Sequence, residues 1–105
     1  MAHPKLKTVP CNLRMFVKEF LLLEEHLTDP EQTCPDCIWK HLLKAEAWLD
    51  EAANLDGRRE FSAVLLRASA GLRTVQALVK EGRLIDAALT ARPLRKSLQP
   101  YVVGL

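Results

Sequence analysis

The chain has 105 residues, of which 49% are apolar and 27% charged, and this length and composition predict a single globular domain over residues 1–105. No stretch approaches the roughly 20 apolar residues of a membrane span, and the N-terminus has no apolar h-region of a signal peptide. We therefore expect no membrane association and no secretion. The expected location is the cytoplasm, another reducing compartment or a virion. The net charge of +2 is divided unevenly, with six basic and ten acidic residues in residues 1–57 and nine and three in residues 58–105.

The first two predicted helices form a hairpin over residues 12–54, after a lead-in of residues 1–11. Apolar residues recur at spacings of three and four from Asn12, a good N-cap, until the segment TDPEQT breaks the pattern. Thr33 and Asp36 have the spacing of a capping box, so the second helix is expected to begin at Thr33 or Cys34.

Two further helices are predicted over residues 58–98. The third follows the turn segment NLDG, in which Gly57 is free to take a positive φ, and runs from residue 58 to residue 81 with Gly82 as its stop. A short fourth helix follows, ended or kinked by Pro93, with a further turn or two after it. The tail, residues 99–105, is expected to be extended.

Small residues gather inside the third helix in the segment ASAG. Gly71 in this segment costs about 1 kcal/mol relative to alanine in a helix interior, which predicts that another backbone crosses close by. No alternating strand pattern and no internal repeat is present. The sequence therefore predicts an all-α fold, a three- to four-helix bundle.

Two cysteines and two histidines carry the most specific chemistry of the chain. Cys34, Cys37 and His41 are spaced by three and four, so they project from one face of the second helix. His26 lies in the last turn of the first helix, and an antiparallel hairpin returns it to the level of Cys34. The pattern His-x7-Cys-x2-Cys-x3-His predicts one structural zinc ion with four protein ligands. The expected fold is therefore a helical bundle with a zinc-stapled N-terminal hairpin.

Other candidate ligands are less favoured. Cys11 lies about 22 Å from His26 along the first helix, and His3 falls in the lead-in. Glu19 shares a helix face with His26 and could orient an imidazole, although a solvated glutamate is the commoner case. Iron–sulfur clusters usually take four cysteines and this chain has three, so zinc is preferred to iron.

The two close cysteines have two other interpretations. Cys-Pro-Asp-Cys at a helix N-terminus resembles the thioredoxin-type active site, in which the helix dipole lowers the thiol pKa, and this resemblance implies a thiol oxidoreductase. That fold places its motif after a β-strand, whereas an amphipathic helix precedes it here. A pair of reduced thiols with no special role also stays open.

The segment LLLEEHLTDPEQTCPDCIWKHLLKAEAWLDEA also resembles small helical proteins of phage and prokaryotic origin that carry a His, CPDC and KH signature without an assigned function. The resemblance covers about a third of the chain. It implies a viral or prokaryotic origin and supplies no mechanism, so no catalytic residue is transferred from it.

The chain lacks the motifs of an enzyme. A catalytic zinc keeps an open position, whereas four ligands close this one, and there is no HExxH, Gly-rich phosphate loop or nucleophile elbow. We therefore expect a non-catalytic interaction module in a larger assembly, with a protein partner or other copies of itself and no small-molecule substrate. The apolar stripe of the third helix and the tail are its expected contacts.

Nucleic-acid binding by the basic C-terminal half is the alternative function. It stays second because there is no block of five like charges and there are few aromatic residues to stack on bases. A solvated helix face is the competing interpretation of the basic residues. The candidate phosphate contacts are Arg58, Arg59, Arg67, Arg73, Arg92, Arg95 and Lys96.

Overall fold

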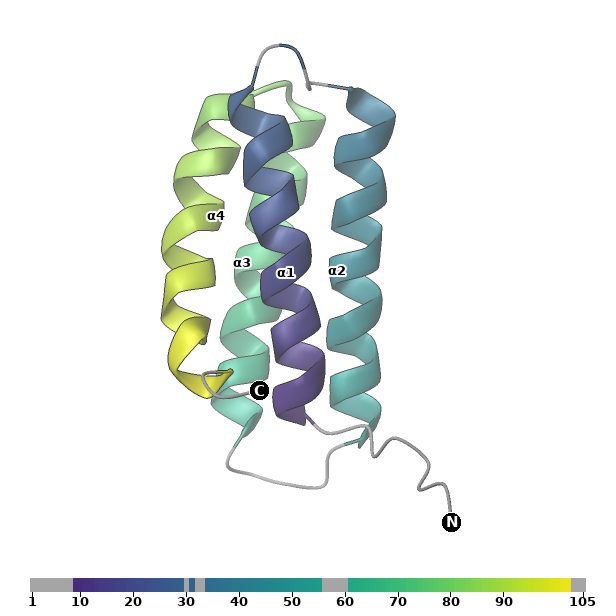
Figure 1. The fold of residues 1–105 in the computed structure, drawn as a ribbon, viewed down its shortest axis with the longest axis vertical. Helices are drawn as coiled ribbons and strands as arrows, with labels where there is room; N and C mark the ends of the chain where they lie inside the picture. Colours follow the sequence, from purple (N-terminus) through teal and green to yellow (C-terminus); the bar gives the residue numbers. More distant parts are fainter. Residues whose placement is uncertain (1–8, 30, 32–33, 56–60, 103–105) are drawn as a thin grey trace.

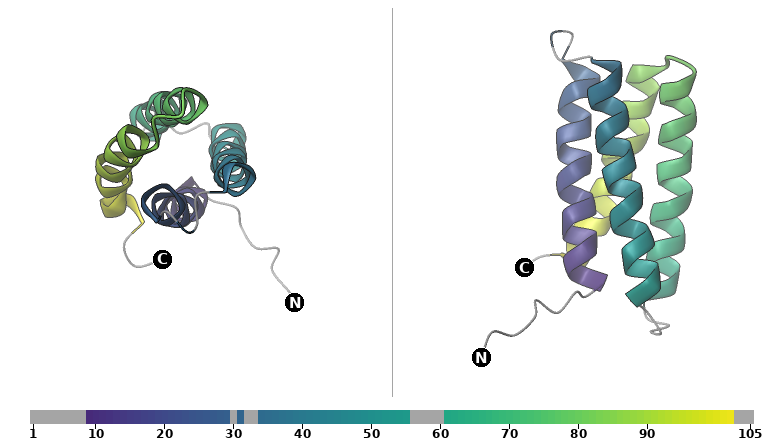
Figure 2. Two further views of the ribbon diagram at one scale, coloured as in Figure 1. Left: turned by 90° about the horizontal axis from the view of Figure 1, so that it is seen from above. Right: turned by 90° about the vertical axis from the view of Figure 1, so that its right-hand side faces the viewer.

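A computed structural model describes residues 9–29, 31, 34–55 and 61–102, and all regular structure in these ranges is helical. The elements are α1 (Val9–Thr28), α2 (Pro35–Leu55), α3 (Ser62–Lys80), α4 (Leu84–Leu98) and the short 3-10 helix η2 (Gln99–Tyr101). The four α-helices run alternately up and down, each beside the next in sequence (Figure 1). α1 also packs on α4, so the helices close a ring around one core (Figure 2). The predicted all-α bundle is confirmed, with four α-helices in the described ranges.

No helix within the described ranges is both long enough and apolar enough to cross a membrane.

α1 begins earlier than the sequence predicts. Asn12, the expected N-cap, lies inside the helix and is buried, and its amide nitrogen has no hydrogen-bond partner among the described residues. Pro10 is compatible with the first turn, because a proline there removes no intrahelical hydrogen bond. Val9 and Leu13 are both buried, so the apolar face continues through this turn, and its burial outweighs the capping preference of Asn12.

The connection between α3 and α4 is built on Gly82. Its φ is +77°, in the left-handed region that favours glycine. The N–H of Gly82 donates to the carbonyl of Val79 at 3.0 Å, and the N–H of Arg83 donates to that of Leu78 at 2.9 Å. This is the hydrogen-bond pattern of a Schellman motif. The predicted helix stop at Gly82 is confirmed.

α4 continues through Pro93, so this proline does not end the helix. A proline inside a helix removes the hydrogen bond to the carbonyl four residues earlier, which here belongs to Leu89. Leu89 and Pro93 are both exposed, so water can reach that carbonyl. Leu94 and Leu98 are buried beyond the proline, and their burial stabilises the last turns of the helix.

The ends of the remaining elements differ from the prediction by a few residues. α2 begins at Pro35, and the capping candidate Thr33 lies outside the described residues. α3 begins at Ser62, and residues 56–60 lie outside the described ranges. The tail is not extended in its described part, because η2 occupies its start and Val102 is buried after it.

The core is filled from all four helices. Its largest fully buried side chains are Leu13, Phe16, Phe20, Leu23, Ile38, Leu42, Val75 and Leu98. The rings of Phe16 and Phe20 stack with their centroids 4.4 Å apart. The apolar stripe of α3, from Val64 to Val79, is buried in this same core. The expectation that this stripe contacts another chain is therefore wrong.

Gly71 makes room for a core leucine of α4. A Cβ atom at this position would lie 2.5 Å from Cδ2 and 2.9 Å from Cδ1 of Leu94, closer than packed atoms allow. The close contact predicted at this glycine is present, but the neighbour is the side chain of Leu94 and not a backbone.

Candidate metal site

α1 and α2 bring the four predicted zinc ligands to the same end of their hairpin. His26 lies in the last turn of α1, whereas Cys37 and His41 lie in the first two turns of α2 (Figure 1). Cys34 directly precedes α2, and its carbonyl accepts a hydrogen bond from the N–H of Ile38 at 3.0 Å. Cys34 therefore occupies the N-cap position of α2.

The two histidines and a glutamate form a connected group. The rings of His26 and His41 stack with their centroids 5.0 Å apart and their planes 28° apart. His41 Nδ1 and Glu19 Oε1 are 2.8 Å apart, and the imidazole N–H donates to the carboxylate. Glu19 is buried, so this hydrogen bond fixes the orientation of the His41 ring and leaves Nε2 as its nitrogen for a metal.

The thiols of Cys34 and Cys37 are adjacent and reduced. The Cys37 thiol donates a hydrogen bond to the sulfur of Cys34, which lowers the pKa of Cys34, and the backbone N–H groups of Cys37 and Asp36 lower it further. The same thiol–thiol hydrogen bond is the main cause of the raised pKa of Cys37. Cys34 is exposed and Cys37 half-exposed, so solvent reaches both sulfurs.

The candidate ligands form two pairs, Cys34 with Cys37 and His26 with His41. Within the described part of the chain, no three His, Cys, Asp or Glu side chains are arranged to hold a metal ion. Cys37 and His41 connect the cysteine pair to the histidine pair, because residues four apart on a helix are neighbours, about 5–6 Å between their Cβ atoms. Two thiols and two imidazoles are a donor set that structural zinc sites use.

The less favoured candidates lie elsewhere. Cys11 is in the first turn of α1, at the opposite end of the hairpin from the start of α2 (Figure 1). His3 lies outside the described residues.

Arg95, one of the candidate phosphate contacts, is used inside the bundle. It donates two hydrogen bonds to the carboxylate of Glu24 on α1, and both side chains are largely buried. This ion pair joins α4 to α1 across 71 positions of the sequence. Two further candidates, Arg58 and Arg59, lie outside the described residues.

The remaining basic candidates are exposed on different sides of the bundle. Arg73 lines a hollow between α2 and α3, whereas Arg92 lines a hollow between α1 and α4. These two boundaries lie on opposite sides of the ring of helices (Figure 2). Arg67 and Lys96 are exposed on α3 and α4. The described residues therefore do not gather Arg73 and Arg92 on one face for a nucleic acid.

The pairing of Glu19 with His41 is the feature of this site that sequence reasoning missed, since it connected Glu19 with His26. The signal was present, because Glu19 falls in a row with the buried Phe16 and Leu23 at helical spacing. A carboxylate in such a row needs a buried partner.

No protein-family model matches the chain, and comparisons with curated proteins and with solved structures gave no match.

Proposed function

We propose that this chain is a non-catalytic interaction module whose α1–α2 hairpin binds one structural zinc ion through His26, Cys34, Cys37 and His41. The observation that carries the proposal is the gathering of these four residues at one end of the hairpin, with His41 held by the buried carboxylate of Glu19. Carboxylate–histidine pairs of this kind are found behind metal ligands, where they orient the ring and raise its basicity.

The zinc ion would act as a staple between two helices. When bound, it supplies a tetrahedral link between the last turn of α1 and the start of α2. Such a link matters in a chain of 105 residues, because a small domain buries less of its surface than a large one. Metal-binding free energy is added to the stability of the folded state.

Metal binding requires a change in side-chain torsions. Glu19 holds the ring of His41, so the ring of His26 and the side chains of Cys34 and Cys37 have to turn toward Nε2 of His41. The thiol–thiol hydrogen bond is lost at the same time, because both sulfurs bind zinc as thiolates. Four ligands leave no open position for a substrate, which supports a structural and not a catalytic role.

The test is the zinc content of the purified protein together with its melting temperature. Cys37→Ser should lower both, whereas Cys11→Ser, the matched control at the far end of α1, should leave the zinc content unchanged. Zinc should also be lost as the pH falls, because protons compete with the metal for thiolates and imidazoles. The staple does not exist if the purified protein contains less than about 0.1 zinc per chain and a strong chelator leaves its melting temperature unchanged.

A dithiol redox centre is the second candidate function, and the adjacent thiols of Cys34 and Cys37 favour it. Cys34 has a lowered pKa and is exposed, as an attacking thiol should be, and Cys37 is placed to resolve a mixed disulfide. A count of reactive thiols with and without chelator separates the two functions. Zinc protects the thiols until the chelator removes it, whereas a redox pair reacts equally in both conditions.

A further inference from the structure

α1 and α4 are neighbours in the ring of helices (Figure 2), and a hollow of about 300 Å³ lies between them. Leu21 lines this hollow from α1, and Ala88 and Leu89 line it from α4. Leu21 is 44% exposed and Leu89 is 66% exposed, so the bundle itself leaves this apolar surface open to solvent. Ile85, one turn before Leu89, is 75% exposed and extends the surface along α4.

Basic residues continue the same outward face of both helices. Residues three, four or seven positions apart share one face of a helix. Arg92, three positions after Leu89, lines the hollow itself. The exposed basic residues three and seven positions from the two leucines are Lys18 and Arg14 before Leu21, and Arg92 and Lys96 after Leu89.

The antiparallel course of α1 and α4 gathers these basic residues at one end of the face. The residues before Leu21 and the residues after Leu89 extend toward the same end of the bundle (Figure 1). The leucines and Ile85 lie nearer the other end, where α1 ends and α4 begins. We call this surface the α1–α4 face. It consists of an apolar half, Leu21, Ile85, Ala88 and Leu89, and a basic half, Arg14, Lys18, Arg92 and Lys96.

The basic half has no acidic counterpart in the described part of the chain. None of its four side chains forms an ion pair or a side-chain hydrogen bond with another described residue. Arg95 on the same helix differs, because its charge is neutralised by Glu24. Positive charges that are exposed and unpaired attract a partner of opposite charge and increase its rate of association.

We infer that the α1–α4 face binds an acidic amphipathic helix of a partner protein. Aliphatic side chains of that helix fill the hollow, and its carboxylates face the basic half. Because every helix rises about 1.5 Å per residue, a partner parallel to α1 repeats the spacing of α1. It carries acidic residues at i and i+4, opposite Arg14 and Lys18, and apolar residues at i+7 and i+11, over the apolar half. Acidic residues in its first turns also stabilise the partner helix.

The inference rests on the proposed function in one respect, because it names the kind of partner that the interaction module binds. It makes no use of the zinc ion.

Two other classes of partner fit this face less well. A nucleic-acid backbone would meet the basic half but would leave the exposed leucines and Ile85 uncovered. An anionic lipid surface would cover them, but Glu25 lines the same hollow, and the ion pair of Arg83 with Asp86 adjoins Ile85. Insertion of the apolar half into a bilayer would remove these charges from water, which is costly.

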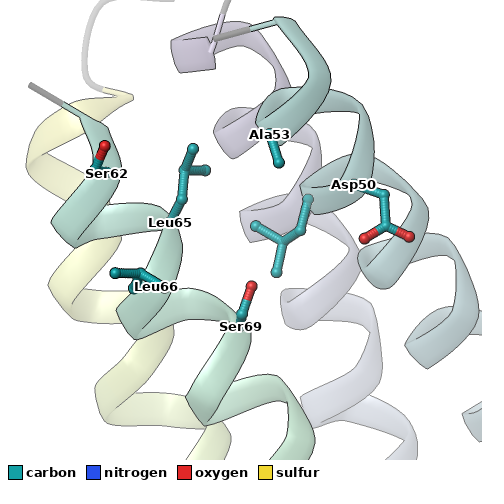
Figure 3. A pocket seen from close by; sticks show the side chains of 7 residues that line it. Asp50, Ala53, Ser62, Leu65, Leu66 and Ser69 are labelled. Carbon is teal, nitrogen blue, oxygen red and sulfur yellow. The ribbon is translucent and has the colours of Figure 1, made fainter. Parts of the chain in front are cut away.

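The hollow between α2 and α3 provides a control surface (Figure 3). It measures about 340 Å³, with Leu65 and Leu66 on the α3 side and Asp50 on the α2 side. Leu66 is 71% exposed, which matches Leu89, but the charged residue that lines this hollow is acidic. An acidic helix would be repelled there, so substitutions on α3 serve as matched controls.

Binding of a labelled synthetic peptide to the full chain, measured by fluorescence anisotropy, tests the inference. The probe is a helical peptide of about 20 residues with glutamates at i and i+4 and leucines at i+7 and i+11, and its Kd should lie below about 300 μM. The Arg92→Glu, Lys96→Glu double variant should bind it about tenfold more weakly. The Arg67→Glu, Arg73→Glu double variant changes the net charge equally on α3 and should stay within about threefold of the wild type.

A second peptide, with lysine in place of each glutamate, separates a lost contact from a damaged fold. It should bind the Arg92→Glu, Lys96→Glu variant about tenfold more tightly than it binds the wild type, because two repulsions become attractions. The apolar contact is tested by Leu89→Ser, which should weaken binding of the acidic peptide about tenfold, whereas Leu66→Ser should leave it unchanged.

A Kd above about 300 μM for the acidic peptide, or binding that ignores both Leu89→Ser and the Arg92→Glu, Lys96→Glu substitutions, would overturn the inference. Single-stranded DNA, or vesicles with one third anionic lipid, would overturn it by binding this face more tightly than the peptide does. So would self-association of the chain that Leu89→Ser abolishes. Zinc content is measured on the same samples. Peptide binding by a chain without zinc removes only the staple, and a zinc-bearing chain that does not bind the peptide removes only this surface.

Discussion

Replacing Gly71 by alanine measures how closely α3 packs on α4. Helix propensity alone would stabilise the protein by about 1 kcal/mol. The new Cβ would meet Cδ2 and Cδ1 of Leu94 at 2.5 and 2.9 Å, and overpacking of a core costs about 1–3 kcal/mol. Leu94 is only 8% exposed, so its side chain cannot move aside without losing contacts. We expect a net destabilisation of about 1 kcal/mol, or about 4–8 °C in melting temperature.

The assay is urea unfolding followed by circular dichroism, repeated in a Leu94→Ala background. Without the leucine methyl groups the repulsion disappears and the helix propensity of alanine remains, so Gly71→Ala should then stabilise by about 1 kcal/mol. The coupling between the two positions is therefore expected to be about 2 kcal/mol. If Gly71→Ala stabilised both backgrounds equally, α3 and α4 would lie farther apart than described, and the reasoning would be refuted.

Three further predictions concern the site and the start of α1. Glu19→Gln should weaken zinc binding about 10- to 100-fold, because the carboxylate that orients His41 is lost. The zinc affinity is measured by competition with a chromophoric chelator, and an unchanged affinity would show that Glu19 does not support the site. Asn12→Leu should raise the free energy of unfolding by about 1 kcal/mol, because it removes a buried amide nitrogen without a described partner; a loss of stability would point to a partner outside the described residues. In metal-free protein, iodoacetamide should modify Cys34 before Cys37, since a lowered pKa gives more thiolate at a given pH. The rate of modification of Cys34 should rise as the pH increases toward that pKa. Peptide mapping that finds Cys37 modified first would contradict this order.

The helices could be predicted from the sequence because their buried faces repeat with the helical period. The stop at Gly82 was also predictable, since only its backbone requirement matters there. The helix ends expected at Asn12 and Pro93 were wrong. Asn12 favours an N-cap and Pro93 a helix end, but burial of the neighbouring leucines outweighs both preferences. The strength of that burial depends on packing partners that the local sequence does not contain.

The candidate site was predictable in membership and not in geometry. Spacing on one helix and an antiparallel hairpin suffice to bring His26 to the end of the hairpin that holds Cys34. The hydrogen bond from His41 to Glu19 depends on the register between α1 and α2 and on how each helix turns about its axis. Neither quantity follows from the residue spacing within one helix, so the carboxylate was connected with the wrong histidine.

The position of η2 determines how the bundle can be joined to other polypeptides. η2 packs on α1, and the start of α1 and the end of α4 lie at the same end of the bundle (Figure 1). The described chain from Val9 to Val102 therefore begins and ends at one end of the bundle, and the candidate metal site lies at the other. A domain with this arrangement can be inserted into a surface loop of a host protein without reordering its helices. The end that carries the candidate metal site would then remain accessible.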